Sequence, residues 1–151
     1  MIARHEWADL IPHQGAMSLL DAVVDWDDTR LHATAVSHRD PANPLRSGGM
    51  LRAVHLCEYA AQATAIHGAL VARRAGARVA PGLLVALREV ELHTVRIDDL
   101  DGTLDVHVTK LLDDGAGAQF EFRVDHAGAR LAAGRVAILY SPPAAADQTV
   151  R

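Results

Sequence analysis

One segment limits the possible folds more than any other. Residues 50–70 (MLRAVHLCEYAAQATAIHGAL) are apolar on almost every face of a helix, yet Glu58 lies among them. The pattern predicts a helix from Met50 to about Ala72, and a helix that is apolar nearly all round must be covered on most sides. A carboxylate is costly to bury there unless another group uses or satisfies it. Glu58 is therefore either a residue that exchanges protons with a substrate or a member of a narrow solvated stripe, paired with a neighbouring cation.

The composition indicates one globular domain. The chain has 151 residues, half of them hydrophobic, and we predict a single domain over residues 1–140 with a frayed tail over 141–151. A net charge of −4 and only 4% aromatic residues argue against a nucleic-acid partner. The single cysteine, Cys57, excludes an intramolecular disulfide. Because no signal peptide or membrane-spanning run is visible, we expect a cytoplasmic protein with no membrane partner.

Strand signals lie on both sides of the predicted helix. Alternating or continuous apolar runs are separated by turns such as Asp113-Asp114-Gly115. The order is two strands, the helix and four strands, which predicts an α+β fold with one helix against an antiparallel sheet. The strands are expected at residues 17–27, 30–37, 83–92, 104–112, 119–125 and 130–140.

Three short features follow one another along the chain at spacings that are informative together. An early Pro-His pair precedes an apolar strand, the helix contains a Glu-x-x-Ala-Gln motif, and an apolar strand follows the helix. They comprise Pro12, His13 and Asp21; Glu58, Ala61 and Gln62; and residues 81–92.

Together these features resemble the hotdog-fold 3-hydroxyacyl-ACP dehydratases. The similarity is greatest to the dehydratase-like subgroup of aryl-polyene and related pigment biosynthesis. The resemblance covers residues 10–140 and implies a hotdog fold, in which an antiparallel sheet wraps one long central helix. It also implies sites formed between two protomers.

The loop before the helix departs from the family pattern. The dehydratases have a catalytic histidine there, in a His-Phe-Pro triplet, whereas residues 43–53 (NPLRSGGMLRA) contain no histidine. Three other histidines are candidates, each with a structural alternative. His38 enters the loop and is otherwise a solvated residue. His55 shares a helical face with Glu58 and is otherwise a surface or interface partner. His13 is otherwise a folding contact.

The resemblance implies dehydration of carrier-bound 3-hydroxyacyl thioesters in a fatty-acid or polyketide (polyene-type) pathway. One group removes a proton beside the carbonyl, another protonates the leaving hydroxyl, and amides at a helix start hold the carbonyl oxygen. We expect Gln62 either to orient Glu58 or to bind across an interface. The candidate residues are Glu58, His38 and His55 for catalysis, and Gly48, Gly49, Met50 and Gln62 for substrate binding.

Two other functions stay open at this stage. A non-catalytic pseudo-dehydratase would bind acyl chains or support an active hotdog partner, and the missing triplet favours it. An acyl thioesterase would use Glu58 to activate water, since fold alone does not decide function. The expected partners are an acyl carrier protein or acyl thioester, and a second hotdog subunit in a homodimer or heteromer. No histidine–carboxylate spacing indicates zinc, and we expect no metal or cofactor.

Overall fold

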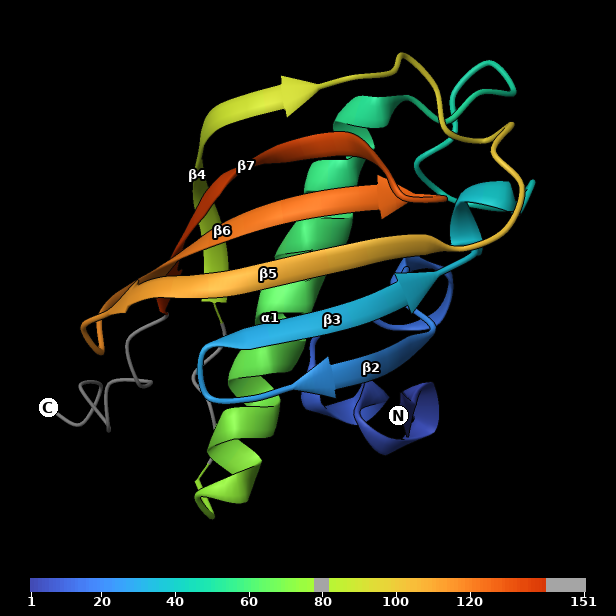
Figure 1. Cartoon of the computed structure of the whole chain (residues 1–151). Helices are drawn as coiled ribbons and strands as arrows, with labels where there is room; N and C mark the ends of the chain where they lie inside the picture. Colours follow the sequence, from blue (N-terminus) through green and yellow to red (C-terminus); the bar gives the residue numbers. More distant parts are fainter. Residues whose placement is uncertain (78–81, 141–151) are drawn as a thin grey trace, which may run out of the picture.

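A seven-stranded antiparallel sheet wraps around one long helix in the computed structural model of the chain, which describes residues 1–77 and 82–140 (Figure 1). The strand order is β1-β2-β3-β5-β6-β7-β4. The predicted α+β architecture is confirmed, whereas the predicted tail over 141–151 lies outside the described residues. The elements are β1 Ile2–Ala3, β2 Ala22–Trp26, β3 Arg30–Ala35, α1 Leu56–Arg74, β4 Gly82–Leu92, β5 Leu104–Asp113, β6 Gly117–His126 and β7 Ala129–Tyr140.

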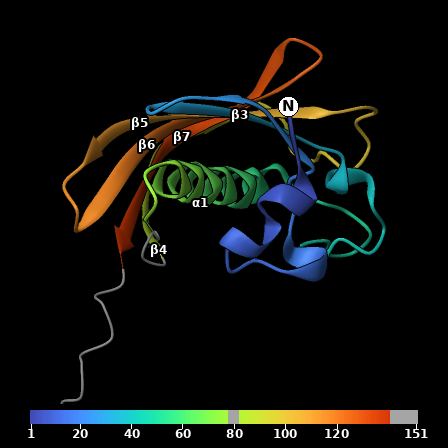
Figure 2. The ribbon, with the colours of Figure 1, turned by 90° about the horizontal axis from the view of Figure 1, so that it is seen from below.

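The core lies between α1 and the concave face of the sheet. Figure 2 shows the helix beneath that face, with β4 bending down beside it. Contacts of α1 with β3, β5 and β6 bury one face of the helix. The alternation predicted for β5 and β6 places every second residue inward, where it meets the helix. The buried residues include Leu56, Ala60, Ala63, Ile66 and Leu70 of α1 and Val106, Val108, Phe122 and Val124 of the sheet.

The helix begins later than the sequence predicted. A 3₁₀ turn over Ala53–His55 precedes α1, which starts at Leu56 rather than Met50. Two long-range bonds explain the difference: the Ile97 amide donates to the Leu51 carbonyl, and the Ala53 amide donates to the Val95 carbonyl, each at 2.9 Å. The chain before Leu56 is therefore held in an extended pairing that sequence periodicity does not reveal.

The helix ends where predicted. Arg73 and Arg74 occupy the last turn, and Gly76 follows with a φ of +72°. The Gly76 amide donates to the Arg73 carbonyl, and the Ala77 amide donates to the Ala72 carbonyl. This is a Schellman motif, in which glycine adopts the left-handed conformation at low cost.

The first long strand is shorter than predicted. Residues 17–27 were expected to form one strand, but Gly15–Met17 is a 3₁₀ turn and β2 begins at Ala22. Leu19 and Leu20 are fully buried nonetheless. The apolar run therefore reflects burial beneath the helix and not participation in the sheet over its whole length.

Strand β4 forms one edge of the sheet. It pairs with β7 on one side only, and its other backbone edge has no strand beside it among the described residues. Large apolar side chains on this strand are exposed, including Leu83, Leu87 and Leu92. A long apolar edge strand is a template for pairing with another chain.

A half-exposed stripe runs along α1 on the side away from the sheet. It comprises Glu58, Ala61, Ala65, Gly68 and Ala72, which recur at helical spacing. The helix was expected to be covered on most sides. In the described chain, this holds for the side that faces the sheet but not for the half-exposed stripe.

The contrast between the two sides of α1 is testable with one substitution at two positions. Ala63 faces the core and is fully buried, whereas Ala65 lies on the half-exposed stripe. We expect Ala63→Asp to lower the free energy of unfolding by about 3–5 kcal/mol, because it buries an unpaired charge. The same change at Ala65 should cost much less, because its carboxylate reaches water. Urea unfolding of both variants measures the difference, and equal losses would contradict this placement of the helix.

Candidate functional site

The loop before α1 is fixed by a buried carboxylate, Asp98, which lies between β4 and β5. Asp98 accepts hydrogen bonds from the Leu51 amide (2.9 Å) and from Arg96 Nε (3.1 Å). The Arg96 guanidinium, followed by the Leu51 amide, holds the pKa of the Asp98 carboxyl well below its usual range. Arg46 lies 3.9 Å from the same carboxylate and donates to backbone carbonyls of its own loop. The loop is thus tied to the chain that follows β4.

A second polar network is centred on Tyr59, which follows Glu58 in the first turn of α1. Tyr59 is fully buried, and its hydroxyl lies 2.8 Å from Ser37 Oγ and 3.2 Å from the Asn43 amide nitrogen. Ser37 Oγ donates its single proton to the Leu19 carbonyl (2.7 Å), so Tyr59 donates to Ser37. Burial raises the pKa of Tyr59. The network joins the helix to the end of β3 and to the N-terminal segment.

Glu58 lies in the first turn of α1 and not near its middle. Its side chain is half-buried. Within residues 1–77 and 82–140 it forms no hydrogen bond or ion pair, so no cation of that part of the chain pairs with it. The partial positive charge at a helix N-terminus favours a carboxylate at this position. Glu58 is therefore available to a group from outside the described chain.

His38 was expected to be either a catalytic histidine or a solvated loop residue; the structure excludes the solvated environment, and a catalytic role stays a prediction. It is fully buried in a 3₁₀ turn over Ser37–Arg39. Its Nε2 donates to the Leu100 carbonyl at 2.9 Å, and Nδ1 is buried without a partner among the described residues. Burial lowers the pKa of His38, so the neutral ring is favoured. No hydrogen bond or ion pair joins it to Glu58 in that part of the chain.

His55 is the residue immediately before α1 and is half-buried. The predicted pairing with Glu58 is absent, because no hydrogen bond or ion pair between them occurs in the described structure. The role of His55 in catalysis stays a prediction.

The amides expected at the helix start lie ahead of it. Gly48 and Gly49 form an exposed turn with φ values of +60° and +73°, closed by bonds between Ser47 and Met50. The Met50 amide is used within this turn, donating to the Ser47 carbonyl at 3.1 Å. These amides lie before the helix, and not at its start, because α1 begins later than predicted. Substrate binding by Gly48, Gly49 and Met50 stays a prediction.

Gln62 connects the helix to the N-terminal segment. It is fully buried; its Oε1 accepts from the Leu19 amide (2.9 Å), and its Nε2 donates to the Met17 carbonyl (2.6 Å). Both ends of the amide are engaged with backbone, and neither bonds to Glu58. The expectation that Gln62 orients Glu58 is wrong, and its position explains why Met17 to Leu19 do not continue β2.

An apolar groove begins one helical turn beyond Glu58. It encloses about 760 Å³, and its lining includes Ala61 and Ala65 of the stripe together with Leu84 and Ile138 of the sheet. His13 lines one side, with its Nδ1 buried and without a partner among the described residues. The volume and apolar lining suit a small-molecule ligand.

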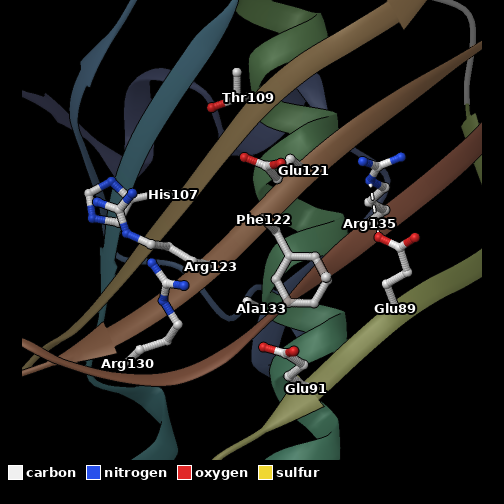
Figure 3. Close-up of a pocket in the computed structure, with 11 residues that line it drawn as sticks. Glu89, Glu91, His107, Thr109, Glu121, Phe122, Arg123, Arg130, Ala133 and Arg135 are labelled. Atoms are coloured by element: carbon white, nitrogen blue, oxygen red, sulfur yellow. Dashed lines mark ion pairs between the residues drawn. The ribbon is translucent and has the colours of Figure 1, made fainter.

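A second hollow, of about 330 Å³, differs in character. Figure 3 shows that charged side chains line it, including Arg123 and Arg135 with Glu89 and Glu121. Arg135 and Glu89 form an ion pair at 3.6 Å. This hollow is balanced in charge, so the groove beside α1 is the better candidate for an apolar substrate.

Residues 1–77 and 82–140 contain neither a candidate metal site nor a helix that could span a membrane. No group of three or more histidine, cysteine, aspartate or glutamate side chains is placed to hold a metal ion. No helix in this part of the chain has the length and apolarity needed to cross a membrane.

The family model of the ApeP-like dehydratases, described as "ApeP dehydratase", matches residues 5–150. The chain belongs to the ApeP-like dehydratase family. No curated protein matches it. The family assignment agrees with the resemblance drawn from the Pro-His and Glu-x-x-Ala-Gln motifs.

Solved structures share the fold of this ApeP-like chain. The dehydratase heterocomplex ApeI:P from Xenorhabdus doucetiae contains a chain 24% identical, with a TM-score of 0.80 over 88% of this chain and 89% of that one. A mutant thioesterase from Pseudomonas aeruginosa is 11% identical (TM-score 0.60, 81% of each chain). A putative thioesterase from Shewanella oneidensis is 14% identical (TM-score 0.62, 92% of this chain and 94% of that one). These similarities confirm the hotdog fold.

Sequence reasoning missed two residues of this region of the ApeP-like chain. Asp98 was missed because the groups of the loop that it holds, the Leu51 amide and Arg46, are distant in sequence, although Arg96 lies only two residues before it. Lys110 lines the groove, and its position was predictable: it continues the inward series Leu104, Val106 and Val108 of β5.

Proposed function

We propose that this chain supplies Glu58 as an acid–base residue for dehydration of carrier-bound 3-hydroxyacyl thioesters, in a complex with a second hotdog protein. The observation that supports this most directly is the setting of Glu58. It lies half-buried at the start of a mostly apolar helix, next to a groove with a mostly apolar lining. Membership of a dehydratase family agrees with it.

The reaction needs two proton-transfer roles. A base removes a proton from C2 of the acyl chain, the C3–O bond breaks, and an acid protonates the leaving hydroxyl, giving an enoyl thioester and water. Glu58 serves the hydroxyl end. The described chain offers no histidine bonded to Glu58, so the other group comes either from His55 after a side-chain movement or from the second protein.

Strand β4 is the surface proposed for that second protein. Its backbone edge is unpaired among the described residues, and its exposed leucines need cover. The similar fold of a chain in the dehydratase heterocomplex ApeI:P supports a hotdog partner. Pairing at this edge would extend the sheet and place a partner close to α1, since β4 bends beside the helix (Figure 2).

One rival has a specific observation in its favour. In a non-catalytic pseudo-dehydratase, Glu58 would do no chemistry, and no histidine of residues 1–77 or 82–140 is bonded to it, as that function would predict. The chain would then only bind acyl groups or stabilise its partner. We also propose that the substrate belongs to a fatty-acid or polyketide (polyene-type) pathway.

Glu58→Gln tests the catalytic role. It preserves shape but removes proton exchange, and general acid–base contributions are worth roughly 10²–10⁴-fold in rate. We expect the complex with the second hotdog protein to lose dehydration of a 3-hydroxyacyl carrier substrate by that factor, with unchanged melting. Glu121→Gln, an exposed carboxylate on β6 outside the groove and the β4 edge, is the matched control and should retain activity. Chromatography of the products separates enoyl thioester from free acid.

Three results would count against the proposal. Equal rates for Glu58→Gln and the wild-type chain would remove Glu58 from the chemistry. A complex without turnover that still binds acyl chains would support the pseudo-dehydratase. Release of free acid in place of an enoyl product would support a thioesterase.

Leu87→Lys tests the assembly surface. Leu87 on β4 is 42% exposed, and Leu111 on β5 is 47% exposed and away from that edge, so Leu111→Lys is a matched control. We expect Leu87→Lys to weaken association with the hotdog partner, or with a second copy, about tenfold or more, because it places a charge in an apolar contact. Light scattering across a dilution series measures this. Equal effects of the two variants would contradict the β4 interface.

A further inference from the structure

One end of the groove beside α1 is polar, although most of its lining is apolar. Lys110, Asp113 and Tyr140 meet there, at the ends of β5 and β7. Tyr140 donates a hydrogen bond to Asp113 Oδ2 at 2.9 Å. Burial, with the neighbouring Asp113 carboxylate, raises the pKa of Tyr140 to about 12, so its hydroxyl keeps its proton. The Tyr140 proton and the Asp113 carboxylate are thus already paired with each other.

Lys110 is the remaining donor at this end. It is the only lysine of the chain and pairs in register with Phe120, whose ring faces inward. No carboxylate of residues 1–77 or 82–140 lies within ion-pair distance of it. Its side chain is half-buried and lines the groove. An ammonium group in this position has a free hydrogen-bonding capacity directed at whatever fills the groove.

The distance from Glu58 to this end suits an extended acyl chain. Lys110 lies near His67. Burial is the main cause of the lowered pKa of His67, and the nearby charge of Lys110 lowers it further. His67 follows Glu58 by nine residues, a rise of about 13.5 Å along the helix axis, and lies half a turn round the helix from it. The groove connects the two sides, because its lining includes Ala61, Ala65, His67 and Lys110. A chain whose reacting carbons lie beside Glu58 would therefore extend along Ala61 and Ala65 toward Lys110.

We propose that the groove selects acyl chains whose free end has an oxygen acceptor, a hydroxyl or a carboxylate, with Lys110 as the donor. The inference rests on the proposed function, because it takes the groove as the acyl site. A methyl end would exclude water from the ammonium group without replacing its hydrogen bonds, and such unpaired polar groups are costly. An oxygen acceptor supplies the missing partner, so Lys110 determines specificity at a position remote from the reaction.

Binding of matched ligands tests the inference without turnover. Acyl pantetheine amides of one chain length are compared with a methyl, a hydroxyl or a carboxylate at the free end, by calorimetry on the complex. The amide removes the head carboxylate of a free fatty acid, so only the far end can engage Lys110. We expect the two oxygen-ended chains to bind about tenfold or more tighter than the methyl-ended one, as for hydrogen bonds to charged groups.

Four variants of Lys110 and of the groove lining locate the effect. Lys110→Met should reduce the preference to within about twofold, because the donor is lost, whereas Lys110→Arg should keep it. Ala65→Phe narrows the groove and should weaken all three ligands, with Ala72→Leu as a second occluding variant if the first fails to fold. A preference that survives in Lys110→Met overturns the inference. So does equal binding of all chains by the wild type, or no binding at all because a partner protein fills the groove.

Failure here is distinguishable from failure of the proposed function. A complex that dehydrates oxygen-ended and methyl-ended substrates equally, before and after Lys110→Met, retains the function and loses the inference. A complex that dehydrates nothing but keeps the binding preference loses the function and retains the Lys110 site.

Discussion

The structure depends on burying one nearly continuous apolar helix against a curved sheet. Such burial is favourable only if the polar groups on the helix find partners. Gln62 bonds the backbone of the N-terminal segment, His67 bonds the Asp27 carbonyl (2.8 Å) and Tyr59 bonds Ser37. Each of these bonds also positions a distant piece of chain. The polar residues of α1 therefore organise the surroundings of the helix, and Glu58 is the exception, because it has no such partner among the described residues.

This exception connects the fold to the proposed function. The loop before α1 is held by Asp98 and Arg46, so it brings no histidine to Glu58. The half-exposed stripe beyond Glu58 forms the floor of the groove. Strand β4, whose outer edge has no neighbouring strand among the described residues, bends beside the helix (Figure 2). A second protein that completes the site would account for three features of the described residues: a carboxylate without a partner, an open groove and a sheet edge without a neighbouring strand.

Local signals made most of the fold predictable from sequence. Alternation placed β5, β6 and β7 within a few residues, and Gly76 marked the helix end. Contacts between distant residues decided the rest. The start of α1 depends on Leu51 pairing with Ile97, and the burial of His38 depends on the Leu100 carbonyl, neither of which has a local signature. For the site, Glu58 stood out because a carboxylate is conspicuous in an apolar helix, whereas the histidine candidates had no comparable signal.

The central claim is that Glu58 belongs to a site completed by another subunit. The most direct measurement is an experimental structure of this chain bound to its hotdog partner. The account predicts that β4 pairs antiparallel with a strand of the partner, and that an imidazole lies close enough to the Glu58 carboxylate for both to reach one substrate. A complex in which β4 stays uncovered, or in which Glu58 faces only solvent, would contradict it.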